Sequence, residues 1–245
     1  MADIQAIPTA TSTNLMSTQL GVLQLNRLLQ LCSVGLPVGG FSFSQGLEYA
    51  IEVDWVHNAA TTANWVETNL TESIANTDLV ILAEQVNALQ QQNFEQFSEL
   101  NQLIIACRES AELRLADLAM GKALIRLLNQ QDIEFGCVLQ QVNQWDEVSF
   151  ISAFALACYC WQIESDAALA GFCWTFIENQ IAAATKLVPL GQTQAQNLMF
   201  KLSEKTSRAI EIAKQTQLDE VGSSLPALAM ASAWHETQYT RLFRS

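Results

Sequence analysis

The stretch LPVGGFSFSQGLEYAIE, residues 36–52, places three glycines and a proline beside serines and acidic residues. A phosphate-binding loop needs a lysine followed by serine or threonine after its last glycine, to reach the phosphates and the Mg²⁺. Here Gly46 is followed by Leu47 and Glu48, and no strand-like segment precedes the loop. The sequence therefore disfavours a nucleotide site of this kind.

A serine nucleophile is the second chemistry that this stretch could support. Residues 40–44 read G-F-S-F-S, so Ser44 stands where the G-x-S-x-G elbow needs its second glycine. A hydrolase would also need a histidine base, and the chain has only His57 and His235. His57 lies in the polar segment DWVHNAA, where a solvated histidine is the usual outcome, so a catalytic triad is disfavoured.

Acid catalysis by carboxylates is the third possibility. Glu48 and Glu52 are spaced to share a helix face, and Asp54 follows them. A solvated acidic face is the more common explanation, and no D-D-x-x-D or H-E-x-x-H signature accompanies them. An all-α enzyme of unknown reaction that uses this acidic face stays open as the alternative function.

The same stretch is also typical of a packing corner. Pro37 is expected to end the preceding helix, and Gly40 permits a sharp turn with close backbone approach. Ser42 and Gln45 have the spacing of a capping box, which would place Gly46 inside the first turns of a new helix. A glycine there costs about 1 kcal/mol relative to alanine, so we expect another helix of the chain or a partner protein to approach it.

Two further stretches share this character. Residues 185–196, TKLVPLGQTQAQ, end one helix at a proline and a glycine and offer Thr193 and Gln196 as a second capping box. Lys186 could complement the helix dipole or contact an acidic partner. The chain ends WHETQYTRLFRS, where aromatic residues alternate with charged ones, as in interface anchors. This end must dock, either on its own domain or on a partner.

Composition limits the partners. The net charge is −13 and charged residues make up 15% of the chain. An acidic protein repels phosphate backbones and anionic headgroups, so we expect neither nucleic acid nor membrane as a partner. The low charge density favours either a surface rich in glutamine and asparagine or large surfaces covered by partners.

The six cysteines show no C-x-x-C pair and mostly fall in apolar helical patterns. Reduced, buried thiols in a cytoplasmic protein are the simplest interpretation. Two histidines and scattered cysteines give no ligand set for a transition metal that prefers imidazole and thiolate, so no metal site is predicted.

Glycine and proline are scarce and no alternating β-pattern occurs, so we predict an all-α protein, a single-domain, orthogonal-type bundle of about ten helices. Residues 1–21 are expected to be a disordered tail, 22–225 the helical domain, and 226–245 a partner-binding tail. One long helix is expected through residues 97–118, with Arg108–Glu112 and Arg114–Asp117 as side-chain pairs. The other predicted helices span residues 22–32, 43–53, 62–75, 78–91, 133–143, 147–160, 166–187 and 194–215, with a short one after Pro226.

Four segments, in order, resemble those of the UreF family of urease accessory proteins. They are LPVGGFSFSQGLE at 36–48, RESAELR at 108–114, the segment 183–192 that ends KLVPLGQ, and the C-terminal HETQYTRLFRS. The resemblance covers most of residues 22–245. It implies an all-α, non-catalytic protein that helps to deliver nickel to urease.

The resemblance also implies partners. Members of this family bind a UreD protein, also called UreH, and the GTPase UreG, and they form homodimers. The assembly inserts nickel into apo-urease in a GTP-dependent step, so nickel is cargo, GTP belongs to UreG, and the chain itself needs no cofactor.

The site residues follow from matching these segments. The end of the chain from residue 226 corresponds to the part that binds UreD, and Lys186 with LVPLGQ to a surface linked to UreG and to the dimer. The loop 37–48 corresponds to a family surface of unassigned role. The expected partner-binding residues are Pro37, Gly40, Phe41, Ser42, Gln45, Gly46, Glu48, Lys186, Pro189, Gly191, Gln192, His235, Glu236, Tyr239, Arg241, Leu242, Phe243 and Arg244.

Overall fold

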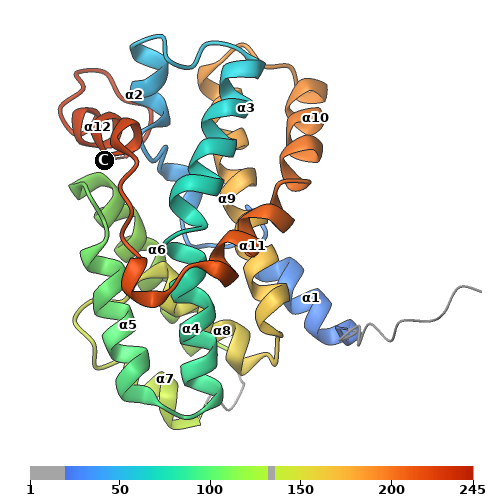
Figure 1. Ribbon diagram of the computed structural model, residues 1–245, viewed down its shortest axis with the longest axis vertical. Coiled ribbons are helices and arrows are strands. Elements are labelled where there is room, and N and C mark those ends of the chain that lie inside the picture. Colours follow the sequence, from blue (N-terminus) through green and yellow to red (C-terminus); the bar gives the residue numbers. More distant parts are fainter. Residues whose placement is uncertain (1–19, 132–135, 245) are drawn as a thin grey trace, which may run out of the picture.

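The computed structural model describes residues 20–131 and 136–244, and these form an all-α protein (Figure 1). The first helices are α1 (Val22–Leu31), α2 (Leu47–Glu52), α3 (Ala59–Thr68), α4 (Asp78–Gln90), α5 (Phe94–Ala106) and α6 (Ala111–Asn129). They are followed by α7 (Gly136–Val142), α8 (Phe150–Cys160), α9 (Ser165–Leu187), α10 (Gln192–Ser203), α11 (Thr206–Gln215) and α12 (Pro226–His235). Short 3-10 turns η1 (Gly40–Ser42) and η3 (Leu218–Glu220) and a π-helix η2 (Asn69–Ile74) complete the elements. The prediction of an all-α fold is confirmed.

Helix α8 is a buried helix with other helices packed around it. Every residue from Phe150 to Cys158 is buried, which agrees with the apolar sequence of this segment. The helix packs against α4, α5 and α6. Its first turn is fixed by Asp117 of α6, because Asp117 Oδ1 accepts hydrogen bonds from Ser149 Oγ and Phe150 N, both at 3.0 Å. Satisfying the free N–H groups at a helix start in this way fixes where α8 begins.

Helix α9 packs against helices from both ends of the sequence. It is 23 residues long and contacts α1, α2, α4, α10 and α11 (Figure 1). At its C-terminal end, Gln180 is buried and donates from Nε2 to Ser44 O at 3.2 Å. The loop that follows Pro37 is therefore held by the same helix that carries Lys186.

The prediction of one long helix through residues 97–118 is wrong. The chain leaves the helix after Ala106 and starts again at Ala111, where Ser110 Oγ accepts from Leu113 N at 3.1 Å. The break turns Arg108 inward, so it pairs with Asp78 and Asp117 and not with Glu112. Arg114 pairs with Glu147, not with Asp117. The apolar spacing at residues 97–118 continues across the break because α5 and α6 both bury apolar side chains.

Two other predicted helices are also divided. The segment 194–215 is split between α10 and α11, and 62–75 is α3 followed by the π-helix η2. Both predicted capping boxes are wrong: α2 begins after Gly46 and α10 after Gly191, and neither helix start has a side-chain cap. Pro37 does not end α1 either, because that helix already ends at Leu31.

The end of the chain packs on its own domain. Helix α12 contacts α2 and α6, and Phe243 is 6% exposed (Figure 1). The disordered tail was predicted at residues 1–21. Residues 1–19 lie outside the described part of the chain, and only Leu20 and Gly21 of this tail are described. Residues 133–135 of the helix predicted at 133–143 also lie outside it.

The six thiols are all free, and Cys32, Cys158 and Cys173 are buried, whereas Cys137 is exposed. Burial raises the pKa of the Cys173 thiol to about 12, so this side chain is a neutral core residue. Within the described residues, no helix has the length and apolar character needed to span a bilayer.

Candidate partner-binding site

The three stretches singled out in the sequence meet in space. Lys186 Nζ lies 5.9 Å from the ring centroid of Phe41 and 5.2 Å from that of Phe243. A lysine ammonium within about 6 Å of an aromatic ring is attracted by the electron-rich face of that ring. The loop 37–48, the end of α9 and the C-terminal segment therefore form one surface, which we call the Lys186 surface after its central residue.

Gly46 provides the close approach that the sequence predicted, although by a different geometry. It precedes α2 with φ = +79°, a left-handed conformation that favours glycine. A Cβ at this position would lie 3.0 Å from Ser232 N and 3.3 Å from Ala231 Cβ. The approaching element is thus helix α12 of the same chain, the first of the two alternatives left open by the sequence.

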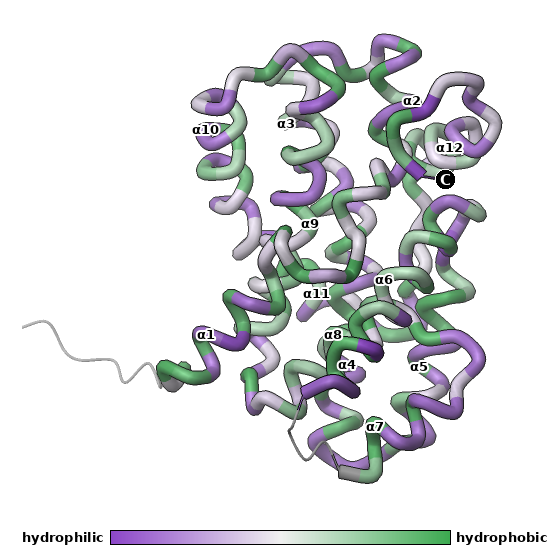
Figure 2. The backbone as a smooth tube through the Cα atoms, turned by 180° about the vertical axis from the view of Figure 1, so that it is seen from behind, coloured by the Kyte–Doolittle hydropathy of each residue, from purple (hydrophilic) through white to green (hydrophobic). Residues whose placement is uncertain are grey.

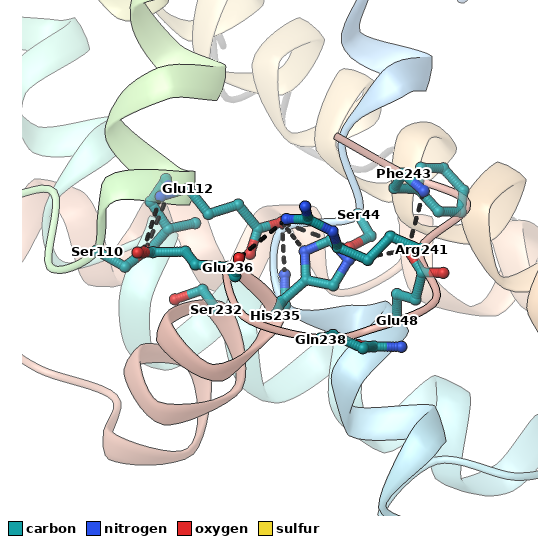
Figure 3. Close-up of polar contacts among 12 residues, drawn as sticks. Ser44, Glu48, Ser110, Glu112, Ser232, His235, Glu236, Gln238, Arg241 and Phe243 are labelled. Atoms are coloured by element: carbon teal, nitrogen blue, oxygen red, sulfur yellow. Dashed lines mark hydrogen bonds and ion pairs between the residues drawn. The ribbon is translucent and has the colours of Figure 1, made fainter. Parts of the chain in front are cut away.

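A buried cluster joins α12 to α2 and α6 (Figure 3). The His235 side chain has no exposed surface, and its ring lies between two carboxylates. His235 Nε2 is 2.9 Å from Glu48 Oε2, and Nδ1 is 3.1 Å from Glu112 Oε1. Ser44 Oγ and Gly46 N also donate to Glu112 Oε1, at 3.4 and 3.3 Å.

Glu48 also holds the last residues of the chain. Its Oε1 accepts from Leu242 N at 2.6 Å and its Oε2 from Phe243 N at 2.9 Å (Figure 3). One residue further, Arg244 N donates to Ser42 O at 2.8 Å, and Phe43 and Arg244 form an isolated parallel bridge. The C-terminal segment, residues 236–244, is therefore bound through its backbone, which leaves several of its side chains outside.

The electrostatics of the cluster favour a charged imidazole. Burial acts to lower the pKa of His235, but hydrogen bonds and charge from Glu112 and Glu48 outweigh it and raise the pKa above its ordinary value. An imidazolium can donate from both ring nitrogens, which matches a carboxylate on each side.

The expected site residues divide by exposure. Gly40, Gly46, Glu48, His235 and Phe243 are buried and have structural roles within the chain. Ser42, Gln45 and Glu236 are partly exposed. The side chains accessible to a partner belong to Pro37, Phe41, Lys186, Pro189, Gln192, Tyr239, Arg241, Leu242 and Arg244, together with the exposed backbone of Gly191.

Exposed apolar side chains lie beside this surface. Tyr239 and Leu242 project from the C-terminal segment, at 103% and 64% exposure. Phe41 is 55% exposed although it faces Lys186. Large exposed aromatic and aliphatic residues that stand beside arginines are typical of protein interfaces.

A second exposed apolar surface runs along α1. Val22, Leu23 and Leu29 are 81%, 63% and 60% exposed, and α1 extends from the body of the molecule (Figure 2). Phe200 of α10, at 71%, is a further exposed aromatic residue. Exposed apolar side chains grouped on one helix are typical of interaction surfaces.

The proposed acidic face does not form. Glu48 is buried under α12 and occupied by His235 and the chain end, whereas Glu52 and Asp54 are exposed. His57 is a surface residue, as its polar sequence predicted. Its Nδ1 lies 3.2 Å from Asp54 O. These residues do not converge on a common site.

The interior contains another polar cluster that the sequence did not reveal. Arg108 lies between Asp78 and Asp117, with N–O distances of 2.9 and 3.2 Å, and all three are largely buried. A cavity of about 90 Å³ adjoins them and is also lined by Asn69 and Gln180. Within the described residues, no three histidine, cysteine or acidic side chains are grouped to hold a metal ion.

Glu112 is the site residue that sequence reasoning missed. It belongs to the RESAELR segment, but its spacing to Arg108 led us to expect a side-chain pair between these two residues. Its role becomes visible only where α6 meets α12, because Glu112 N also donates a hydrogen bond to Glu236 Oε1 at 3.2 Å. No local signal in the sequence links residues that lie so far apart.

Comparisons with known proteins agree with the resemblance. A family model described as UreF matches residues 56–203. The urease accessory protein UreF of Marinomonas sp. (strain MWYL1) is 50% identical over 234 residues, covering 96% of this chain and 98% of the relative. The urease accessory protein UreF 2 of Brucella anthropi is 41% identical, covering 91% and 97%. The UreF of Alkalilimnicola ehrlichii is 39% identical, covering 91% and 96%.

These relatives are named as accessory proteins and not as enzymes, in agreement with the prediction of a non-catalytic chain. Their matches extend over nearly their whole length, and the identity is far above what chance similarity gives. The chain belongs to the UreF family of urease accessory proteins.

Proposed function

We propose that this protein is a non-catalytic scaffold in urease maturation. It would bridge a UreD (UreH) protein and the GTPase UreG and regulate the GTP-dependent insertion of nickel into apo-urease. Membership of the UreF family is the observation that carries this proposal. The structure supports it with exposed apolar side chains beside a positively charged Lys186, on an otherwise acidic protein.

The UreD protein would bind the C-terminal segment. Tyr239 and Leu242 offer exposed anchors, and Arg241 and Arg244 lie beside them. Because Glu48 holds the backbone of this segment, the anchors are presented in a fixed conformation. A preformed surface binds with less loss of conformational entropy than a disordered one.

UreG would contact the neighbouring part, Lys186 and the segment 187–192. Pro189, Gly191 and Gln192 are exposed there and follow the end of α9. The Lys186 ammonium could pair with an acidic group of the GTPase, because it is the charged group at the centre of this surface.

A homodimer would cover the apolar surface of α1. Val22, Leu23 and Leu29 are the exposed apolar side chains that such a dimer would bury. Nickel would pass through the assembled complex as cargo, GTP would stay with UreG, and the chain would hold no cofactor of its own. The free thiols fit the reducing cytoplasm as the place of action.

The test is co-expression with the cognate UreD- and UreG-type proteins, followed by size-exclusion chromatography with mass determination. The double variant Tyr239→Ser, Leu242→Ser should lose the UreD-type protein. The variant Phe200→Ser, an exposed aromatic on α10, is the matched control and should retain it. Lys186→Glu should lose UreG, whereas Lys122→Glu on α6 should not.

A wild-type chain that stays alone with every nucleotide and nickel addition would overturn the scaffold proposal. If the Tyr239→Ser, Leu242→Ser variant still forms the normal complex, the scaffold proposal stands. The UreD-type protein would then bind at another surface of the chain. Point variants are preferable to a truncation at Leu225, because α12 packs against α2 and α6.

A further inference from the structure

His235 is held in an unusual environment for a histidine. Its side chain is fully buried, and each ring nitrogen lies within hydrogen-bond distance of a carboxylate from a different helix. Glu48 comes from α2 and Glu112 from α6. The only other histidine, His57, is on the surface at 49% exposure.

The number of protons on the ring decides whether this arrangement is attractive. A neutral imidazole has one N–H and one lone pair, so one of its nitrogens would face a carboxylate oxygen without a hydrogen between them. The imidazolium donates at both positions. The three side chains together carry a charge of about −1 with the proton and about −2 without it, and an uncompensated buried charge is costly.

The same cluster holds the C-terminal segment. Glu48 accepts the imidazole N–H and the two backbone N–H groups of Leu242 and Phe243, so it is the shared acceptor. Two charged side chains of the segment itself, Glu236 and Arg241, also lie at this cluster. Glu236 Oε1 accepts from Glu112 N, and the Arg241 guanidinium donates to Glu236 O at 3.0 Å (Figure 3).

We propose that His235 is a proton-operated latch for the C-terminal segment. With the proton on the imidazole, residues 236–244 are docked on α2. When the proton leaves to solvent, the ring lone pair faces one of the two carboxylates and no positive charge remains between Glu48 and Glu112, so the segment detaches while the helical body remains folded. This device controls whether the anchors Tyr239 and Leu242 are presented, and it requires no particular partner.

The direction of the pH effect follows from the raised pKa of His235. The stabilisation that the imidazolium contributes is fully present below the ordinary histidine pKa of about 6.5. It is lost as the pH rises from there through the higher pKa of the folded protein. Docking should therefore be tightest at mildly acidic pH and weaken on the alkaline side.

The test uses the fact that the chain has two histidines. The ring resonances of the two histidines are followed by NMR on histidine-labelled protein from about pH 5.5 to about pH 9.5, a range that extends to both sides of the ordinary histidine pKa. In parallel, trypsin cleavage after Arg241 is measured at each pH and divided by the cleavage rate of a free peptide of residues 236–244. That ratio removes the pH dependence of trypsin itself.

We expect His235 to deprotonate above the ordinary histidine pKa of about 6.5. The corrected cleavage should rise over the same range by up to about tenfold per pH unit, as loss of one proton requires. In Glu112→Gln, one carboxylate charge is absent, so both the titration of His235 and the onset of cleavage should move to lower pH together. His57→Gln is the control and should leave the onset unchanged.

Three results would overturn the latch. The first is a His235 ring that is neutral at a pH where the segment is protected. The second is protection that stays constant while His235 titrates. The third is a Glu112→Gln protein that moves the titration of His235 but not the onset of cleavage. The NMR titration and the trypsin cleavage of the wild-type chain together decide the first two, even if a variant does not fold.

Discussion

His235 and Glu48 are joined by a contact of 2.9 Å between Nε2 and Oε2, although 187 positions separate them in the chain. Through this contact the last helix becomes part of the domain that the first helices build. The C-terminal residues thus have two roles, since their buried side chains complete the fold and their exposed side chains are available to a partner.

Phe243 and Leu242 are neighbours in the sequence, so substituting each in turn tests whether the buried and the exposed side chains have different roles. Phe243→Ala should lower the free energy of unfolding by about 2–4 kcal/mol, because a buried ring beside Lys186 is removed. Leu242→Ala should change it by less than about 0.5 kcal/mol, because this side chain is mostly exposed. Urea denaturation followed by circular dichroism measures both, and an equal loss in the two variants would contradict the division.

Alanine substitutions at Gly46 and Gly39 can distinguish the cost of a steric conflict from the cost of backbone strain. Both have φ = +79°, but a Cβ at Gly39 meets nothing within 4 Å, whereas one at Gly46 meets α12. We expect Gly39→Ala to cost about 1 kcal/mol and Gly46→Ala about 2–4 kcal/mol, since the latter adds overpacking to the strain. Thermal unfolding should show the lower midpoint for Gly46→Ala, and the reverse order would argue against the close approach of α12.

Arg108 and Arg114 lie in one sequence motif but in different environments. Arg108→Met leaves Asp78 and Asp117 buried without their cation and should cost about 3–5 kcal/mol. Arg114→Met breaks a half-exposed pair with Glu147 and should cost less than about 1 kcal/mol. Chemical denaturation at neutral pH compares them, and a loss for Arg114→Met as large as that for Arg108→Met would refute the assignment of the buried pair.

Self-association should depend on α1. Leu23→Glu combined with Leu29→Glu places charge on the exposed apolar surface, and we expect it to shift the protein to a monomer without loss of helicity. Analytical ultracentrifugation over a range of concentrations measures this. Leu218→Glu, another exposed leucine far along the chain, serves as the control, and a dimer that persists in the α1 variant would place the interface elsewhere.

The fold class could be predicted because it rests on local signals. Scarce glycine and proline and three-to-four-residue apolar spacing are properties of each segment, and the helix predicted at residues 147–160 is found as α8, Phe150–Cys160. Helix boundaries at residues 107–110 and 203–206 could not be predicted in the same way. At both places the apolar stripe continues, and the break depends on how neighbouring helices fill space.

The site could be predicted only in part. The stretches around Gly46, Lys186 and Phe243 were identified from residue types, and they do meet. Their contacts were not predictable, because the polar partners come from distant elements: Glu112 for His235, and Asp78 for Arg108. Spacing along a helix favoured nearer partners for the same charges, and tertiary packing overrode it.

The most direct test of the scaffold function is the nickel content of urease. Apo-urease would be produced with its other accessory proteins and nickel, either with or without this chain, then purified and analysed for nickel per active site. Nickel occupancy is expected to rise several-fold when the chain is present, and the Tyr239→Ser, Leu242→Ser variant, although folded, is expected not to raise it. Equal nickel occupancy with and without the chain would contradict a role in urease maturation.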